Sequence, residues 1–275
     1  MKPAAFDYIR VETADEALSL LARYGDDARI LAGGQSLMAM LNMRLAQPKV
    51  LIDIMHVPAL RSIAHKGGTL NVPAGVRQAE LLTRDSLSEE NPLLAKALPW
   101  VGHAQTRARG TVCGSIAHAD PSAELPLALA VLGGTITLRS AKRSRDIPAS
   151  AFFIGMMMTD RQEGEMISGV NFPQLPEGAG TAFHEIGRRK GDFAIVSCAA
   201  IVSGVNIRLA VGGVNDTPVV KDWSGLNDSD IDDALNALAW SLEARDDLHA
   251  TARYRRDLVR NLGRQTILEA RACAS

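Results

Sequence analysis

Cysteine is scarce in this chain: Cys113, Cys198 and Cys273 are the three among 275 residues, and no two of them form a CxxC pair. This usage excludes a disulfide framework and a cysteine-ligated zinc site, and it leaves too few thiolates for an iron–sulfur cluster. Free, widely separated thiols are typical of a reducing compartment. We therefore expect a cytoplasmic protein.

Neither an excess of charge nor a long apolar run is present. The chain has 30 basic and 31 acidic residues and a net charge of -1, which excludes a global attraction to nucleic acid or an anionic membrane. Its most apolar stretch, "FAIVSCAAIVSGV", is interrupted by serines and falls short of the roughly 20 residues of a membrane span. The start, "MKPAAFDYIR", has no apolar h-region, so we expect no secretory signal and no membrane insertion.

Motifs of catalysis and of metal binding are also missing. There is no GxSxG, no GxGxxG and no GxxxxGK[ST], and the six histidines show neither HxxxH nor HxH spacing. We therefore predict no catalytic side chain and no metal ligands. The hydrophobic fraction of 47% is ample for the core of a soluble globular protein.

Apolar periodicity and turn signals predict an α+β protein. Thr13 and Glu16 have capping-box spacing, and Gly25 can end the helix that they begin. The predicted helices are residues 13–24, a helix from Ser36, 92–101, about 230–243 and about 250–262. The predicted strands are residues 28–32, 50–54, a hairpin over 61–76, 135–140, 165–173, and an antiparallel sheet beyond the Pro/Gly-rich boundary at 173–180.

Two glycine loops stand out among the turns. The first is Ala32-Gly33-Gly34-Gln35-Ser36, and the second is Thr111-Val112-Cys113-Gly114-Ser115. Each precedes a predicted helix start, where free N–H groups and the helix dipole suit an anion. Two such loops can share a pyrophosphate, but their composition is equally that of two ordinary turns.

Three longer segments carry a family resemblance. "ILAGGQSLMAMLNMRLAQP", "GTVCGSIAHADPSAELP" and "GRRKGDFAIVS" resemble, in order and spacing, the flavoprotein subunit of the molybdenum hydroxylases. This family includes the medium subunit of aerobic carbon monoxide dehydrogenase and the flavin domain of xanthine dehydrogenase. The resemblance runs from "MKPAAFDY" to "YRRDLVRNL", nearly the whole chain.

The resemblance implies the fold. Residues 1–175 are expected to form an FAD-binding domain of the vanillyl-alcohol-oxidase (PCMH) type, with α/β subdomains at about 1–57 and 58–175. FAD would lie between these subdomains. Residues 176–275 are expected to form a C-terminal α+β domain like that of the carbon monoxide dehydrogenase flavoprotein.

The resemblance also implies an FAD site. The glycines of the two loops would let the main chain reach the pyrophosphate of FAD. An acidic residue after the second loop would contact the flavin chain. The strand at Ile167 would meet the pyrimidine edge of the isoalloxazine. His184 stands where xanthine dehydrogenase has a lysine, and Phe193 where carbon monoxide dehydrogenase has a tyrosine. The implied contacts are Ala32, Gly33, Gly34, Gln35, Ser36, Leu37, Thr111, Val112, Cys113, Gly114, Ser115, His118, Asp120, Glu124, Ile167, His184 and Phe193.

Two features leave alternatives open. Cys113 stands where the family has a glycine. If the backbone there has a positive φ, a cysteine would destabilise the fold by about 1 kcal/mol. If φ is negative, the cysteine side chain needs only space. A redox-active thiol is the other interpretation of Cys113, although no partner is evident. For the run Met156–Met158 we predict core packing, with a surface for a partner subunit as the alternative.

The resemblance implies an FAD-dependent electron-transfer subunit of a heterotrimeric molybdenum hydroxylase. A small subunit with two [2Fe–2S] clusters and a large molybdopterin subunit would be its partners, commonly as a dimer of heterotrimers. The acceptor could be NAD, a quinone, a cytochrome or oxygen. Two alternatives remain: a stand-alone flavin-dependent reductase resembling that of UDP-N-acetylenolpyruvoylglucosamine, or a flavin-free assembly module.

Overall fold

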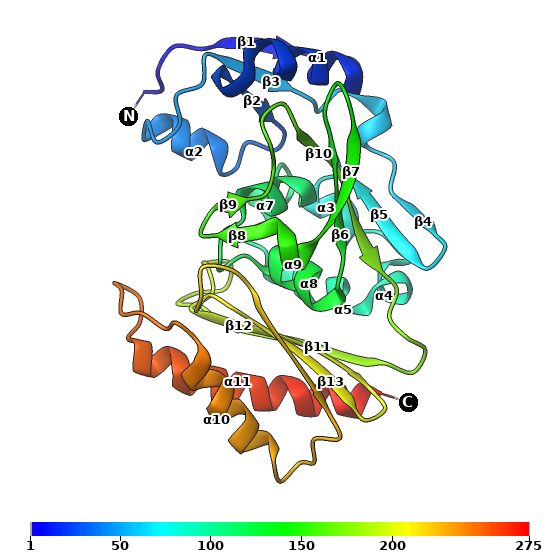
Figure 1. Ribbon diagram of the computed structural model, residues 1–275, viewed down its shortest axis with the longest axis vertical. Coiled ribbons are helices and arrows are strands. Elements are labelled where there is room, and N and C mark those ends of the chain that lie inside the picture. The colour runs from blue at the N-terminus through cyan, green and yellow to red at the C-terminus, as the bar shows by residue number, and fades with distance from the viewer. Residues whose placement is uncertain (1, 275) are drawn as a thin grey trace.

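The computed structural model describes residues 2–274 and stacks them as three units (Figure 1). A small sheet with its helices lies at one end, a larger sheet surrounded by short helices lies in the middle, and a sheet covered by two helices lies at the other end. The α+β fold predicted from the sequence is confirmed.

The N-terminal unit is a parallel sheet in the order β1-β3-β2. The Thr13 hydroxyl accepts a hydrogen bond from the Glu16 N–H at 3.1 Å, and Gly25 follows the connecting helix at a φ of 51°, so both predicted helix signals are confirmed. Strand β3 is buried along its full length, as a central parallel strand should be. The elements are β1 (Asp7–Arg10), α1 (Ala14–Tyr24), β2 (Ala28–Leu31), α2 (Leu37–Asn42) and β3 (Val50–Asp53).

The middle unit is an antiparallel sheet in the order β4-β5-β10-β6-β7. Its first hairpin turns at Gly67 and Gly68, both at positive φ, as predicted. The strands are β4 (Ala64–Lys66), β5 (Thr69–Pro73), β6 (Thr135–Arg139), β7 (Ser144–Pro148) and β10 (Met166–Pro173), with a small hairpin of β8 (Phe153–Gly155) and β9 (Met158–Thr159). The helices are α3 (Gln78–Leu82), α4 (Leu87–Glu90), α5 (Pro92–Ala97), α6 (Ala104–Arg107), α7 (Val112–His118), α8 (Glu124–Leu132) and α9 (Ala149–Phe152).

The C-terminal unit is an antiparallel sheet in chain order, β11-β12-β13-β14. Helix α11 covers one of its faces, and the wholly buried helix α8 of the middle unit contacts the other at β12 and β13 (Figure 1). The elements are β11 (Gly180–Ile186), β12 (Val196–Ser203), β13 (Asn206–Gly212), β14 (Val219–Ser224), α10 (Ile231–Ser241) and α11 (Ala252–Cys273).

Helix α11 runs well beyond the predicted end near Leu262. Gly263, which resembles a terminator in the sequence, lies where a Cβ would come within 2.8 Å of the Leu235 side chain. The glycine therefore serves the close packing of α10 on α11, and tertiary contact overrides its low helix propensity.

The methionine run corrects another prediction. Met156, Met157 and Met158 are 52%, 50% and 58% exposed, so they do not pack in the core. They lie at the turn of the β8–β9 hairpin, and Met157 adopts a φ of 53°. The alternative interpretation, a surface for a partner, is the one compatible with this exposure.

Candidate functional site

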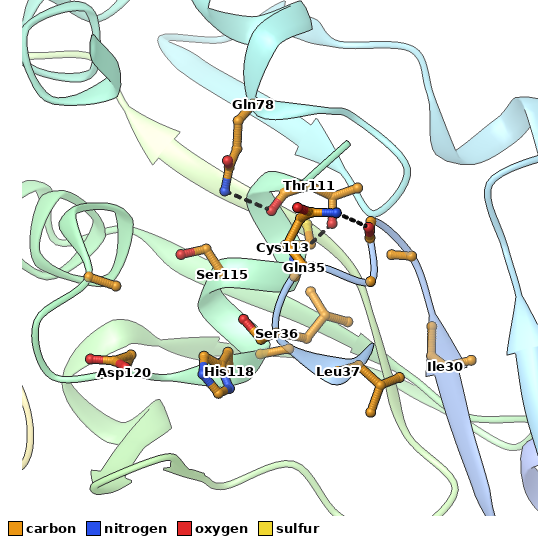
Figure 2. Close-up of a pocket in the computed structure, with 18 of the residues that line it drawn as sticks. Ile30, Gln35, Ser36, Leu37, Gln78, Thr111, Cys113, Ser115, His118 and Asp120 are labelled. Carbon is orange, nitrogen blue, oxygen red and sulfur yellow. Dashed lines mark hydrogen bonds between the residues drawn. The ribbon is translucent and has the colours of Figure 1, made fainter. Parts of the chain in front are cut away.

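A cavity of about 620 Å³ has the two glycine loops in its wall (Figure 2). Its volume lies in the usual range for cofactor sites. The first loop follows β2 of the N-terminal unit, and the second begins α7 of the middle unit.

No helix among residues 2–274 is long and apolar enough to span a bilayer.

The first loop needs its glycines for two different reasons. A Cβ on Gly33 would overlap the carbonyl oxygen of Arg109 and come within 2.6 Å of the Gly110 Cα, so only glycine allows the two loops to meet. Gly34 has a φ of 71°, which is left-handed backbone that glycine adopts readily. The Gln35 amide donates to the Gly33 carbonyl at 3.1 Å and braces the turn. The loop thus presents main chain to the cavity.

The second loop is a capped helix start. The Thr111 hydroxyl accepts from the Gly114 N–H at 3.0 Å, and a Cβ on Gly114 would approach that hydroxyl oxygen to 2.7 Å. Gln78 ties the loop to α3: its main-chain N–H donates to the Gly110 carbonyl at 2.8 Å, and its amide donates to the Thr111 carbonyl at 3.4 Å (Figure 2). Both loops are therefore held rigidly before any ligand arrives.

Cys113 lies in the first turn of α7, and its φ is outside the left-handed region. The backbone cost expected at positive φ therefore does not arise, and the Cys113 side chain needs only space. Its thiol donates to the Val72 carbonyl at 3.4 Å. Complete burial raises the pKa of this thiol far above its ordinary value. The thiolate that redox chemistry requires is thus disfavoured.

Most residues implied by the resemblance converge on this cavity. His118, Asp120 and Glu124 line it after the second loop, Ile167 lines it from β10, and Phe193 from the β11–β12 loop. The full set of implied residues in the lining is Ala32, Gly33, Gly34, Gln35, Ser36, Leu37, Thr111, Cys113, Gly114, Ser115, His118, Asp120, Glu124, Ile167 and Phe193.

Two implied residues lie elsewhere. Val112, the first residue of α7, is fully buried and does not line the cavity. His184 points to the opposite face of β11, where its Nε2 lies 2.7 Å from the Glu269 carboxylate of α11. Side chains alternate across a strand, so β11 directs Phe183 and Glu185 toward the middle unit and His184 away from it. The expectation of a flavin contact at His184 is therefore not carried further.

One end of the cavity holds an arginine-bound carboxylate that sequence reasoning missed. Glu165 is 2% exposed and accepts from Arg145 Nε and Nη2, each at 2.9 Å. Burial opposes ionisation, but the hydrogen bonds from Arg145 keep the pKa of Glu165 below its ordinary value. Arg161 lines the same end and donates to the Glu165 carbonyl at 3.0 Å. No local motif distinguishes these residues, because they meet only when β7 and β10 fold together.

The other end is lined by Asp120, Glu124, Asp192 and Phe193. Glu124 is buried at the first turn of α8, and burial raises its pKa to about 7. Phe193 is 65% exposed at the cavity edge. This end therefore combines a titratable carboxyl group with an aromatic ring open to solvent.

These features fit FAD. The diphosphate suits two glycine loops that line one cavity and hold glycine where a Cβ would meet Arg109 or the Thr111 hydroxyl. The cavity volume of about 620 Å³ also gives space for ring systems. Among residues 2–274, no group of three or more His, Cys, Asp or Glu side chains is arranged to hold a metal ion.

Comparisons with known proteins point to the same cofactor. Residues 4–175 match the FAD-binding domain in molybdopterin dehydrogenase, and residues 181–270 match the carbon monoxide dehydrogenase flavoprotein C-terminal domain. The chain is 38% identical over 283 residues to the 6-hydroxypseudooxynicotine dehydrogenase complex subunit alpha of Paenarthrobacter nicotinovorans, covering 98% of this chain and 96% of the relative.

Solved structures agree with these sequence matches. The carbon monoxide dehydrogenase of Hydrogenophaga pseudoflava that lacks the Mo-pyranopterin moiety contains a chain that superposes with a TM-score of 0.93 at 31% identity, and all of both chains is covered. Quinoline 2-oxidoreductase from Pseudomonas putida 86 contains one with a TM-score of 0.91 at 35% identity, and 98% of each chain is covered.

Proposed function

The chain belongs to the family of FAD-binding medium subunits of molybdenum hydroxylases, and from this premise we propose that it passes electrons from the [2Fe–2S] clusters of a partner subunit through FAD to an external acceptor. The observation that carries the proposal is the meeting of both glycine loops at one cavity. NAD, a quinone, a cytochrome and oxygen are all acceptors of suitable chemistry.

Each part of the cavity has a distinct task in this proposal. The main chain of residues 32–36 and 111–115 would hold the diphosphate, and Gln78 would keep the second loop in place. Ile167 and Phe193 would border the ring systems, and the phenylalanine can shield or stack but cannot donate a hydrogen bond. FAD, when bound, supplies the redox chemistry, while the protein supplies its orientation and electrostatics.

Partner subunits are the second part of the proposal. Relatives are named as a complex subunit, a medium subunit and a medium chain, which supports assembly with other subunits. We propose a small iron–sulfur subunit and a large molybdopterin subunit as these partners, arranged as a dimer of heterotrimers. The Met156–Met158 hairpin is a candidate contact with one of them, since all three side chains are exposed. Met157 also lines the cavity. Methionine adapts well to such surfaces.

The test is a visible absorption spectrum of the chain purified alone and together with the products of its neighbouring genes. We expect a flavin spectrum in both samples, release of FAD on denaturation, and iron–sulfur absorbance in the co-purified complex only. Steady-state turnover by the isolated chain would instead favour a stand-alone reductase. A colourless chain that takes up no FAD and binds no partner would refute the proposal.

A further inference from the structure

A second cavity, of about 410 Å³, lies behind the first glycine loop. Ala32, Gly33 and Gln35 line both this cavity and the larger one, so the loop is a wall that the two cavities share. We call the second space the rear cavity. Its volume suits a small organic molecule. The polar side chains in the rest of its lining are Tyr8, Asp53, His56, Arg77 and Arg109.

The rear cavity lies at the carboxyl ends of two parallel strands. Leu31, the last residue of β2, pairs with Asp53, the last residue of β3, and both line the cavity. Met55 and His56 follow β3 and continue the lining. Ligands of open sheets with parallel strands bind in the crevice beyond these strand ends. The rear cavity therefore occupies a place in the fold where ligands are commonly bound.

The acidic group of the lining is already engaged. Asp53 is the only carboxylate among the described residues that line the rear cavity, and it is 8% exposed. Its Oδ2 accepts from the Tyr8 hydroxyl, and its Oδ1 accepts from the Met55 N–H at 2.8 Å. Both oxygens of this carboxylate thus have partners within the N-terminal unit, and neither partner is a cation.

Two arginines bring positive charge to the rear cavity without an acidic partner. Within residues 2–274, neither Arg77 nor Arg109 forms an ion pair, and the buried Nε of Arg77 has no hydrogen bond. Glu80, the acidic residue nearest to Arg77 along the chain, is paired with Arg61 at 2.6 Å. A guanidinium group that is partly removed from water without a counter-charge favours an anion beside it.

The main chain of both arginines is fixed by the contacts that join the two glycine loops. Arg77 forms an isolated β-bridge with Thr111 of the second loop. The Arg109 carbonyl lies against Gly33 of the first loop, and the Arg109 N–H donates to the Thr106 carbonyl at 3.2 Å. The two side chains therefore project from backbone positions that are set before a ligand binds, which reduces the ordering cost of binding.

We propose that the rear cavity is a second ligand site, which holds the phosphate group of a small phosphate monoester between Arg77 and Arg109. A phosphate monoester carries nearly two negative charges at neutral pH and has three acceptor oxygens, which match two guanidinium groups. Leu31, Met38 and Met55 offer apolar contact to the organic part of the ligand. This site is separate from the one proposed for FAD and does not depend on it.

The test is isothermal titration calorimetry of phenyl phosphate into the full chain loaded with FAD. We expect one binding site for phenyl phosphate, at least about tenfold weaker binding of inorganic phosphate, and no binding of phenol, since charge and apolar contact are both needed. Equal affinities for phenyl phosphate and inorganic phosphate would overturn the assignment to an ester and leave a site for the free ion.

Substitutions of the two arginines locate the site. Arg77→Met and Arg109→Met should each weaken phenyl phosphate binding by at least about tenfold, because each removes a charge-assisted hydrogen bond. Arg10→Met is the matched control: Arg10 of β1 is exposed and lies outside the lining, so a change below about twofold is expected. Arg109 is exposed, so Arg109→Met should keep the fold even if Arg77→Met does not, and thermal unfolding checks both.

The outcomes separate this site from the proposed function. Phenyl phosphate binding that survives both arginine substitutions would overturn the proposal, and so would its absence in wild type. If binding is absent and the same substitutions release the partner subunits from the complex, the arginines hold an acidic side chain of a partner instead. A chain that takes up no FAD can be titrated in the same way, so a failure of the proposed function leaves this test intact.

Discussion

The two ends of the cavity each bury a glutamate beside the same space, but they surround it with different neighbours. Glu165 has a bidentate arginine and accepts from the Gln162 N–H at 2.9 Å as well, and its pKa is lowered. Burial raises the pKa of Glu124 to about 7, and the negative charge of Asp120 acts in the same direction. Burial thus raises the pKa of a carboxyl group at both ends, and only at Glu165 do arginine hydrogen bonds override it.

The largest expected effect comes from removing the partner of the ionised glutamate. Arg145→Met should lower the free energy of unfolding by about 3 kcal/mol at pH 7, because it leaves the buried Glu165 carboxylate with only the exposed Arg143 and the Gln162 N–H as partners. Urea denaturation measures this. Arg143→Met is the matched control: Arg143 also contacts Glu165, at 3.3 Å, but it is 61% exposed, so a loss below about 1 kcal/mol is expected. Equal losses in the two variants would contradict the contrast between the two ends.

Removing the buried carboxyl group of Glu185 should instead raise the free energy of unfolding. In the folded chain the pKa of Glu185 is about 8, above the ordinary glutamate value of about 4.5. Its stability contribution is therefore full below about pH 4.5 and is lost as the pH rises toward about 8. Glu185→Gln should match wild type near pH 4.5 and exceed it by about 2 kcal/mol at pH 8. Thermal unfolding across this range tests the sign, and a variant less stable than wild type at pH 8 would rule out the unpaired carboxyl.

Between the two ends, the loops meet at Gly33. Gly33→Ala should weaken FAD binding by at least about tenfold, because the added methyl group displaces Arg109 and the second loop. Gly169→Ala provides the comparison, since its Cβ would make only ordinary contacts of 3.4 Å or more with β5. Flavin fluorescence titration of both variants would show whether the loop contact, rather than any added methyl group, sets the affinity.

The smallest effect concerns the Cys113 thiol, whose pKa is set chiefly by burial. Burial raises the pKa of the Cys113 thiol, and Cys198 is equally buried, whereas Cys273 is exposed. A thiol reagent at pH 8 should label Cys273 of the native chain and leave the other two unmodified, and mass spectrometry after unfolding should find all three reactive. Rapid native labelling of Cys113 would restore the interpretation of that thiol as redox-active.

Local signals predicted much of the fold. The cap at Thr13, the glycine after α1 and the hairpin at Gly67 and Gly68 were all readable, because each depends on a few adjacent residues. Prediction was wrong where distant segments decide. Gly263 resembles a helix end but accommodates α10, and Met156–Met158 resemble a core segment but lie on a surface hairpin.

The candidate site divides in the same way. The two glycine loops were recognisable from composition and family resemblance, and they do line one cavity. Glu165, Arg145 and Gln78 were not recognisable, because a buried polar residue has no sequence signature until its partner is known. His184 was placed by resemblance alone, and strand alternation turns it toward α11.

By itself, the sequence determined the family, the α+β class and the two glycine loops that line the cavity, because spacing, caps and glycines act over short distances. Only the tertiary structure decided which carboxyl groups carry charge. Glu165 and Glu124 are the same residue type and both are buried, but hydrogen bonds from an arginine on β7 lower the pKa of Glu165, whereas burial and the charge of Asp120 raise that of Glu124. Electrostatic interactions depend on distances in space, which the order of residues along the chain does not contain.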